Sequence, residues 1–299
     1  MLKKILVGVL VLAFTSVVAG LVFVWQVGAW NILFPSSQHD ITPPGKFGDI
    51  TPPAVLVFSK TNQFRHKEGI AGGTKAFVEI SEELGLSMFA TENGAVFNDR
   101  DLALFDVVVF LNATGDMLSA DQESAFESWL EGGGGWLGVH AAGDGSHASW
   151  SWYMEKLIGA NFTAHILGPQ FQVATVVTEQ EQHPLNQGSA LTWQAEEEWY
   201  SWDASPREKG FLVTATVDEN TYSPVQNLFG SSRNLAMGDH PISWSNCVGN
   251  GRSFYTALGH TAEAFENPSF RRQLENALRW LQGGEPCTKA QSQQASSAG

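Results

Sequence analysis

The hydrophobic positions of the chain begin with one long uninterrupted run. Lys3 and Lys4 precede an apolar stretch from Ile5 to Trp25. At about 1.5 Å per residue this stretch is about 31 Å long, enough to cross the hydrocarbon core of a bilayer. Residues 1–30 are therefore predicted to form a signal anchor, a single transmembrane helix. A cleaved signal peptide is the competing interpretation, although the run exceeds the usual length of a signal core.

The apolar pattern stops over residues 31–53 and again over residues 283–299. The first segment contains Asp-Ile-Thr-Pro-Pro twice, at 40–44 and 49–53. Paired prolines favour extended polyproline geometry, so a semi-rigid Pro-rich stalk is predicted. The second segment is rich in Gln, Ser and Ala, which predicts a disordered tail.

Between these segments, residues 54–282 alternate strand and helix patterns and are predicted to form one α/β domain. Continuous apolar runs predict buried strands, and Ser119 with Gln122 at capping-box spacing predicts a helix start. The predicted strands of the first half are 54–58, 86–90, 106–111 and 136–139, with helices after the first and third. This alternation indicates a doubly wound parallel sheet. The predicted elements of the second half are strands 171–178, 211–217 and 251–258, and a last helix that Asn267 and Pro268 begin.

Charge and cysteine content narrow the classes of function. The net charge is 17 − 31 = −14, and no stripe of Lys or Arg is present, so nucleic-acid binding is not expected. Two lysines before the apolar run place the N-terminus in the cytoplasm. The domain is then predicted on the periplasmic side of the inner membrane. The cysteines, Cys247 and Cys287, are either a disulfide that pins the C-terminus or two unpaired thiols.

Several polar side chains come directly after predicted strands, where ligands of open α/β sheets bind. His66, His140, Asp144 and His260 all occupy such positions. His140 stands at a strand-to-helix turn where some hydrolases have a Ser or Cys nucleophile. Because the residue here is His, a mechanism with a Ser or Cys nucleophile at this turn is not supported. His140 is either a general base, a metal ligand or a substrate contact, or else a buried His bonded to the backbone.

A second group of candidate residues combines carboxylates with aromatic rings. Glu198 is followed by Trp199 and Tyr200, and His240 precedes Trp244. Flat rings stack on sugars and carboxylates bind hydroxyl groups or transfer protons, although an acidic run is also typical of a solvated face. The eight histidines show no H-x-H or H-E-x-x-H spacing. The metal state therefore stays unknown, with a divalent metal held by residues from distant loops as one alternative.

Five blocks in order resemble the ThuA-like (trehalose utilisation) family. They are residues 57–66, 134–142, 197–200, 240–244 and 251–261. The resemblance implies a class I glutamine amidotransferase-like fold, that is, a flavodoxin-like doubly wound parallel sheet. It also implies that the amidotransferase Cys nucleophile is missing, so the chain is not expected to be a glutamine amidotransferase. Glu197 stands where the family usually has Asp, which makes Glu198 the stronger candidate for a role.

These observations predict a membrane-anchored ThuA-like protein that acts on a disaccharide or keto-sugar derivative by hydrolysis, elimination or isomerisation. Glu198 is the expected acid or base, with His140 as its partner. The expected substrate-binding residues are His66, Asp144, Trp199, Tyr200, His240, Trp244 and His260. A non-catalytic carbohydrate-binding module is the first alternative, and a purely structural envelope protein is the second.

Overall fold

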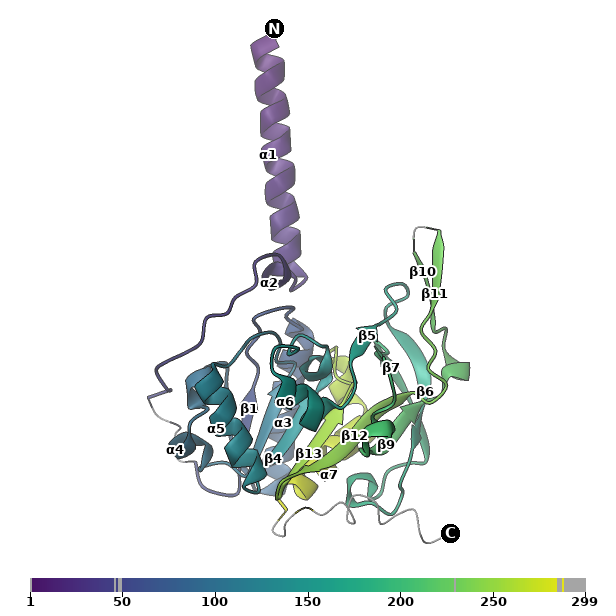
Figure 1. Ribbon diagram of the computed structural model, residues 1–299. Coiled ribbons are helices and arrows are strands. Elements are labelled where there is room, and N and C mark those ends of the chain that lie inside the picture. Colours follow the sequence, from purple (N-terminus) through teal and green to yellow (C-terminus); the bar gives the residue numbers. More distant parts are fainter. Residues whose placement is uncertain (1, 46, 48–49, 229, 284–286, 288–299) are drawn as a thin grey trace.

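A nine-stranded sheet flanked by helices is the centre of the molecule (Figure 1). The computed structural model describes residues 2–45, 47, 50–228, 230–283 and 287. The strand order is β2-β1-β3-β4-β13-β12-β9-β6-β7. Strands β2 to β13 of this order run parallel, and from β13 onward each neighbouring pair is antiparallel. The sheet therefore has a parallel half and an antiparallel half.

The strands of the parallel half are β1 (Ala54–Phe58), β2 (Ser87–Thr91), β3 (Val107–Leu111), β4 (Gly135–Val139) and β13 (Gly251–Thr256). Those of the antiparallel half are β6 (Gln172–Thr178), β7 (Thr192–Glu197), β9 (Leu212–Val217) and β12 (Pro241–Val248). Two short pairs lie outside this sheet, β5 (Phe162–Ala164) with β8 (Ser201–Trp202) and β10 (Val225–Leu228) with β11 (Ser231–Asn234).

The helices of the domain connect the parallel strands or close the chain. They are α3 (Lys67–Leu84), α4 (Asp99–Leu102), α5 (Ala120–Glu131), α6 (Ser151–Tyr153, continued by a π-turn to Ile158) and α7 (Pro268–Leu281). Ser119 and Gln122 form the predicted capping box at the start of α5. Asn267 caps α7 with its side chain, and Pro268 is the first residue of that helix, as predicted. The predicted elements of the parallel half are thus confirmed to within a few residues.

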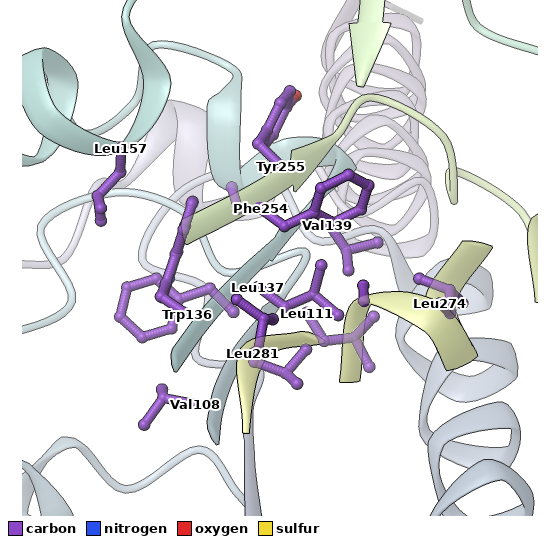
Figure 2. Packing of buried hydrophobic residues seen from close by; sticks show 14 of the residues in the cluster. Val108, Leu111, Trp136, Leu137, Val139, Leu157, Phe254, Tyr255, Leu274 and Leu281 are labelled. Atoms are coloured by element: carbon purple, nitrogen blue, oxygen red, sulfur yellow. The ribbon is translucent and has the colours of Figure 1, made fainter. Parts of the chain in front are cut away.

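The parallel strands are buried on both faces, which explains their unbroken apolar sequences. Phe110 of β3 packs against Phe126 of α5 and Tyr153 of α6 on one face. On the other face, Leu281 of α7 lies against the backbone of Gly135 in β4. Figure 2 shows Trp136 and Leu157 on one side of the strands and Leu274 and Leu281 on the other. Two helical layers therefore enclose one continuous core.

The antiparallel half was predicted only in part. Strands β6 and β9 match predicted strands, whereas no strand is predicted from the sequence at β7 or β12, and Trp244 of β12 is a predicted binding-site residue. β12 carries Ile242 and Trp244 with no exposed surface, so this part of the predicted site is a central strand.

The apolar N-terminal run forms helix α1 (Leu2–Gln26), followed by the short helix α2 (Trp30–Leu33). By length and composition, Lys3–Gln26 is a candidate membrane span, and the side chains of its 18-residue apolar window are not buried by the domain. A signal sequence passes the same test, so both interpretations of the sequence stand.

The segment after α2 lies on the domain, which differs from the expected spacer between helix and domain. The Asp40 carboxylate accepts a hydrogen bond from Lys60 at 2.5 Å, and the Asp40 carbonyl accepts one from Gln122 at 2.7 Å. Phe47 packs edge-on against Phe89. The limits of the stalk and of the domain themselves stay predictions.

The two cysteines form a disulfide, which decides between the two alternatives. Cys247 of β12 and Cys287 are bonded, with 5.4 Å between their Cα atoms. The bond fastens the chain beyond α7 to the antiparallel half. The rest of the predicted disordered tail lies outside the described residues.

Candidate functional site

Three histidines and one glutamate converge at the carboxyl end of the parallel strands. His66 follows β1, His140 follows β4, His260 follows β13, and Glu198 follows β7. One donor atom from each of these four residues lies within 4.8 Å of the other three. We call these four residues the His–Glu cluster. It joins positions that are up to 194 residues apart in sequence (260 − 66).

Strained backbone at two strand ends holds this arrangement. His140 and Asn112 both have positive φ angles, 49° and 51°, which non-glycine residues seldom adopt. The Asn112 amide nitrogen donates to the Gly259 carbonyl at 3.0 Å, and its oxygen accepts from the Ala141 amide at 3.2 Å. The loops that carry His140 and His260 are therefore tied to one residue.

The orientation of the His140 ring is fixed by the backbone. Nδ1 lies 2.7 Å from the Ala257 carbonyl, which can only accept, so Nδ1 carries the proton. In the neutral ring Nε2 is then a lone-pair donor, and it points into the cluster. Nε2 lies 3.0 Å from His260 Nδ1, and the Tyr200 hydroxyl donates to it at 3.0 Å. The predicted hydrogen bond from a buried His140 to the backbone is therefore present, while its second ring nitrogen faces the other residues of the cluster.

Glu198 is held as a carboxylate by the imidazoles around it. Its Oε2 lies 3.1 Å from His260 Nδ1 and 3.6 Å from His140 Nε2. Its Oε1 lies 3.0 Å from His165 Nδ1. Burial alone would raise the pKa of Glu198, but the hydrogen bonds from the histidines outweigh it and hold the pKa far below the usual range. A carboxylate in this state is a poor proton donor, which argues against Glu198 as a general acid.

His66 completes the cluster with an unsatisfied atom. Its side chain is buried, and its Nδ1 has no hydrogen-bond partner among the described residues. Its ring stands edge-on to His140 and His260, with centroids 4.8 and 4.6 Å away. Burial, followed by the neighbouring histidines, holds the pKa of His66 well below its usual value. The ring is therefore neutral, and a buried unpaired nitrogen is costly unless a ligand binds it.

Asp144 follows His140 by four residues and interacts electrostatically with Glu198. One carboxylate oxygen accepts from the Ser146 amide at 2.8 Å. Burial, with a smaller contribution from the negative charge of Glu198, raises the pKa of Asp144 to about 6. A carboxyl group with this pKa exchanges a proton readily near neutral pH.

Three of the predicted substrate-binding residues do not reach the cluster. Trp244 is fully buried, and its Nε1 donates to the Ile158 carbonyl at 3.0 Å. Trp199 is also buried and donates to the Gln172 carbonyl. His240 is bonded to Glu219 at 2.7 Å and to the Tyr200 carbonyl at 2.8 Å. These rings have no free face to stack on a sugar.

Sequence reasoning missed two residues that contact Glu198, and it left the role of its neighbour Glu197 open. His165 and Gln170 both contact Glu198 Oε1, and no strand-end position marks either of them in the sequence. Glu197 accepts a hydrogen bond from the Gly259 amide at 2.7 Å, and its other oxygen has no partner among the described residues. Burial raises the pKa of Glu197 to about 8. It therefore holds the His260 loop rather than adding charge to the site.

Two cavities flank the His260 loop and share Phe171 as a wall. The cavity at the cluster has a volume of about 530 Å³ and is lined by His66, His260 and Gln170, among others. The second cavity has a volume of about 570 Å³ and is lined by Trp193 and Glu197, among others. Sugar-sized ligands fit either volume, but only the first cavity reaches the cluster.

The donor set of the cluster matches a divalent transition-metal site. Neutral imidazole and carboxylate are the ligands that Zn²⁺, Mn²⁺ and Fe²⁺ use, at about 2.0–2.2 Å for Zn²⁺. A metal ligand of this kind commonly donates its second ring nitrogen to a carbonyl or carboxylate, as His140 does to Ala257. His66, His140, Glu198 and His260 are thus the residues that could hold such an ion.

A sequence model of the ThuA family, described as trehalose utilisation, matches residues 54–281. The chain belongs to this family. A solved structure from Bacteroides uniformis, described as ThuA-like, shares 26% identity with a TM-score of 0.67, over 82% of this chain and 97% of that one. Another, from Parabacteroides merdae and also described as ThuA-like, shares 18% identity with a TM-score of 0.60, over 80% and 92%.

No curated protein shows significant similarity to the chain. The family match and the first structure confirm both the resemblance and the fold class that the sequence predicts. The second structure, at lower identity, supports the fold alone. A relation to sugar utilisation is thereby supported at the level of the family.

Proposed function

We propose that this ThuA protein is a divalent-metal-dependent enzyme that converts a disaccharide or keto-sugar derivative. The convergence of His66, His140, Glu198 and His260 on one point carries the proposal. Three neutral imidazoles and one carboxylate leave a bound divalent ion with a net charge of +1. Such an ion attracts the hydroxyl and carbonyl oxygens of a sugar.

The chemistry divides between the metal and a proton carrier. A bound ion would act as a Lewis acid that polarises a keto or hydroxyl oxygen of the sugar. Asp144, with its pKa of about 6, would accept the proton from the carbon beside the polarised carbonyl. The electron pair that this leaves can expel a leaving group from the next carbon away from the carbonyl, and the leaving group then takes a proton from water. Return of a proton to the former carbonyl carbon instead gives the isomer. Elimination and isomerisation therefore need the same two groups, and water addition after elimination gives net hydrolysis.

Glu198 has a different role here from the one that the sequence suggests. Its carboxylate is held ionised by the hydrogen bonds from His165 and His260, so we propose it as a metal ligand and not as the acid or base. Asp144 takes the proton-transfer role, and Tyr200 supports His140 through its hydroxyl.

Elemental analysis of the full chain, purified without chelator or affinity tag, tests this proposal. We expect about one equivalent of a divalent transition metal per chain, and its loss in the His140→Ala variant. Because His140 is fully buried, the partly exposed His260→Gln variant serves as a second probe that need not unfold the chain. His39→Gln, at a histidine that contacts Asp116 and not the cluster, is the matched control.

A chain that stays metal-free after incubation with Zn²⁺, Mn²⁺ and Fe²⁺ would contradict the metal role. The alternative of a non-catalytic sugar-binding module makes a separate prediction. It requires saturable sugar binding that survives in both Glu198→Gln and Asp144→Asn, with no product in the unaltered chain. Product formation that Asp144→Asn abolishes while metal content is retained would support the enzyme.

A further inference from the structure

The mouth of the cluster cavity is built partly from the end of the N-terminal helix. Gln26 and Val27 line this cavity together with His66 and His260. The helix that is long and apolar enough to span a membrane therefore ends beside the cavity that reaches the cluster. Figure 1 shows this end of α1 next to the domain.

Several contacts fasten this helix end to the segment that carries His66. The Lys67 ammonium donates to the Trp25 and Gln26 carbonyls at 2.7 and 3.0 Å and lies 4.3 Å from the centre of the Trp25 ring. The Arg65 amide donates to the Gly28 carbonyl at 2.9 Å. A cation on the last carbonyls of a helix is a favourable cap. The helix is thus seated on the domain and is not a free tether.

Gly28 shows how close this seating is. Its φ is +81°, a conformation that favours glycine, and a Cβ atom at this position would lie 2.2 Å from the Arg65 carbonyl oxygen. The chain therefore turns against the Arg65 backbone without a side chain between them. From there Asn31 donates to the Thr61 carbonyl at 2.8 Å, so α2 is fastened to the segment between β1 and His66 as well.

Exposed apolar side chains occur at this helix end and in the segment that leads to the cavity residue Gln170. Trp25 and Val27 are 60% and 43% exposed, and Leu167, three residues before the cavity residue Gln170, is 57% exposed. Trp30, Ile32, Leu33 and Phe34, in and next to α2 directly after this helix end, are exposed as well. Large aromatic and aliphatic residues at the end of a membrane helix are typical of the bilayer interface. In water alone such a patch would be costly.

The length of the helix places this rim at a membrane surface. Lys3–Gln26 contains 24 residues. At about 1.5 Å per residue it extends about 36 Å, slightly more than the roughly 30 Å of a hydrocarbon core. With Lys3 and Lys4 at one interface, Gln26 and Val27 reach the other interface. The mouth is fastened to them, so it lies at the same level.

We infer that the cluster cavity opens onto the membrane surface and takes a saccharide that a membrane lipid carries. The inference rests on the proposed function for the chemistry and on retention of the helix for the location. A lipid-borne sugar would extend its polar head past Phe64 and Phe171 to the cluster, while its acyl chain stays beside Trp25 and Val27 in the bilayer. A water-soluble sugar would gain nothing from this apolar rim.

Photo-crosslinking of the full chain in lipid nanodiscs tests the location. The photoreactive residue p-benzoylphenylalanine replaces Leu167 in one variant and Leu191 in the other. The two leucines are 57% and 56% exposed, so they form a matched pair. Leu191 precedes β7, whose far end at Glu197 lies at the site, so it marks the opposite end of the sheet.

We expect at least a tenfold excess of lipid adducts at position 167 over position 191, as counted by mass spectrometry. Equal adduct formation, or removal of the helix from the chain in the cell envelope, would overturn the inference. Neither result depends on a metal. Failure of the location and failure of the proposed metal chemistry are therefore separate outcomes.

A second measurement distinguishes the source of the sugar. Metal-loaded chain in nanodiscs is given either trehalose in solution or the same amount of trehalose 6-palmitate in the bilayer, and hydrogen exchange is followed at residues 64–68 and 165–171. We expect at least threefold slower exchange with the lipid-borne sugar alone. Protection by free trehalose to the same degree, or no protection by the palmitate, would contradict a lipid-borne substrate.

Discussion

The parallel half of the sheet supplies three histidines to the His–Glu cluster, whereas the antiparallel half supplies its one carboxylate. His66, His140 and His260 follow β1, β4 and β13, and Glu198 follows β7 at the far edge. The histidines of one half would offer ring nitrogens to a metal ion, and the negative charge that would attract the ion comes from the other half. Neither half is a metal site by itself, so any metal chemistry requires that both are correctly docked.

The two halves meet at β13 and β12 and share one core there. Six residue pairs join these strands, from Ser243 opposite Thr256 to Val248 opposite Gly251. Above the strands, Glu197 of the antiparallel half accepts from Gly259 in the loop of the parallel half. Two kinds of contact therefore hold the halves together: the paired and packed strands β12 and β13, and the buried hydrogen bond between Glu197 and Gly259. Substitutions can break these separately.

The largest expected loss of stability comes from a substitution in the core at the junction of β12 and β13, which we call the seam. Trp244→Ala removes a fully buried ring that packs on Trp202 and Tyr255 at 5.1 and 4.7 Å, and it leaves the Ile158 carbonyl without its donor. We expect the free energy of unfolding to fall by about 4 kcal/mol. Urea denaturation measures this fall.

The matched control is Trp193→Ala, because Trp193 is a partly exposed ring in the same half. Trp193→Ala should lower the free energy of unfolding by less than half as much as Trp244→Ala. Equal losses in the two variants would mean that the seam is not the shared core of the two halves.

The next effect separates the polar contact from the packing. The pKa of buried Glu197 is about 8, above the usual value of 4.5, so the folded state keeps a proton that the unfolded chain loses above about pH 4.5. The stability that this group contributes is fully present below pH 4.5 and is lost as the pH rises through 8. Glu197→Gln does not titrate. Between pH 5 and pH 8 the free energy of unfolding of the unaltered chain should therefore fall relative to that of the variant, by on the order of a few kcal/mol.

Unfolding in urea at pH 5, 6.5 and 8 with a chelator present gives the comparison without a contribution from bound metal. The exposed neighbour Glu196, replaced by Gln, controls for the loss of one carboxylate from the surface. Parallel pH profiles for the Glu197→Gln variant and the unaltered chain would show that Glu197 is ionised in the folded state.

The sequence predicts the parallel half well because its signals are local. Continuous apolar runs, the Ser119 capping box and the Asn267–Pro268 helix start each lie within a few residues. In the antiparallel half, the sequence pattern of β12 indicates a binding site and not a buried strand, because Trp244 and His240 are residue types that sugar sites use. Their core role depends on partners far along the chain, such as Ile158 and Glu219, that no local pattern indicates.

The sequence identifies the four residues of the His–Glu cluster, but it does not show that they converge on one point. Strand-end positions identified His66, His140 and His260, and the acidic-aromatic block identified Glu198. No spacing rule brings them together, because the strand order that places β13 beside β4 is a property of the whole sheet. For the same reason His165 and the unsatisfied nitrogen of His66 had no signal in the sequence.

The smallest of these effects concerns the parallel half alone. Asn112→Ala removes both hydrogen bonds that tie the His140 and His260 loops, leaving the Gly259 carbonyl and the Ala141 amide buried without their partner. We expect a loss of about 2 kcal/mol in stability, since each unsatisfied buried group costs about 1–3 kcal/mol but part of this is relieved by relaxation. Metal affinity should fall about 10–100-fold, as for other residues that orient ligands.

Asn112→Gly distinguishes the backbone from the side chain in this effect. Glycine adopts the φ of 51° without strain but makes neither hydrogen bond. If the loops depend on the side chain, metal affinity measured by competition with a chelator falls equally in the Gly and Ala variants, while stability falls less in Gly. If affinity recovers in Gly, the backbone conformation at the end of β3 positions the histidines, and the two hydrogen bonds only stabilise the fold.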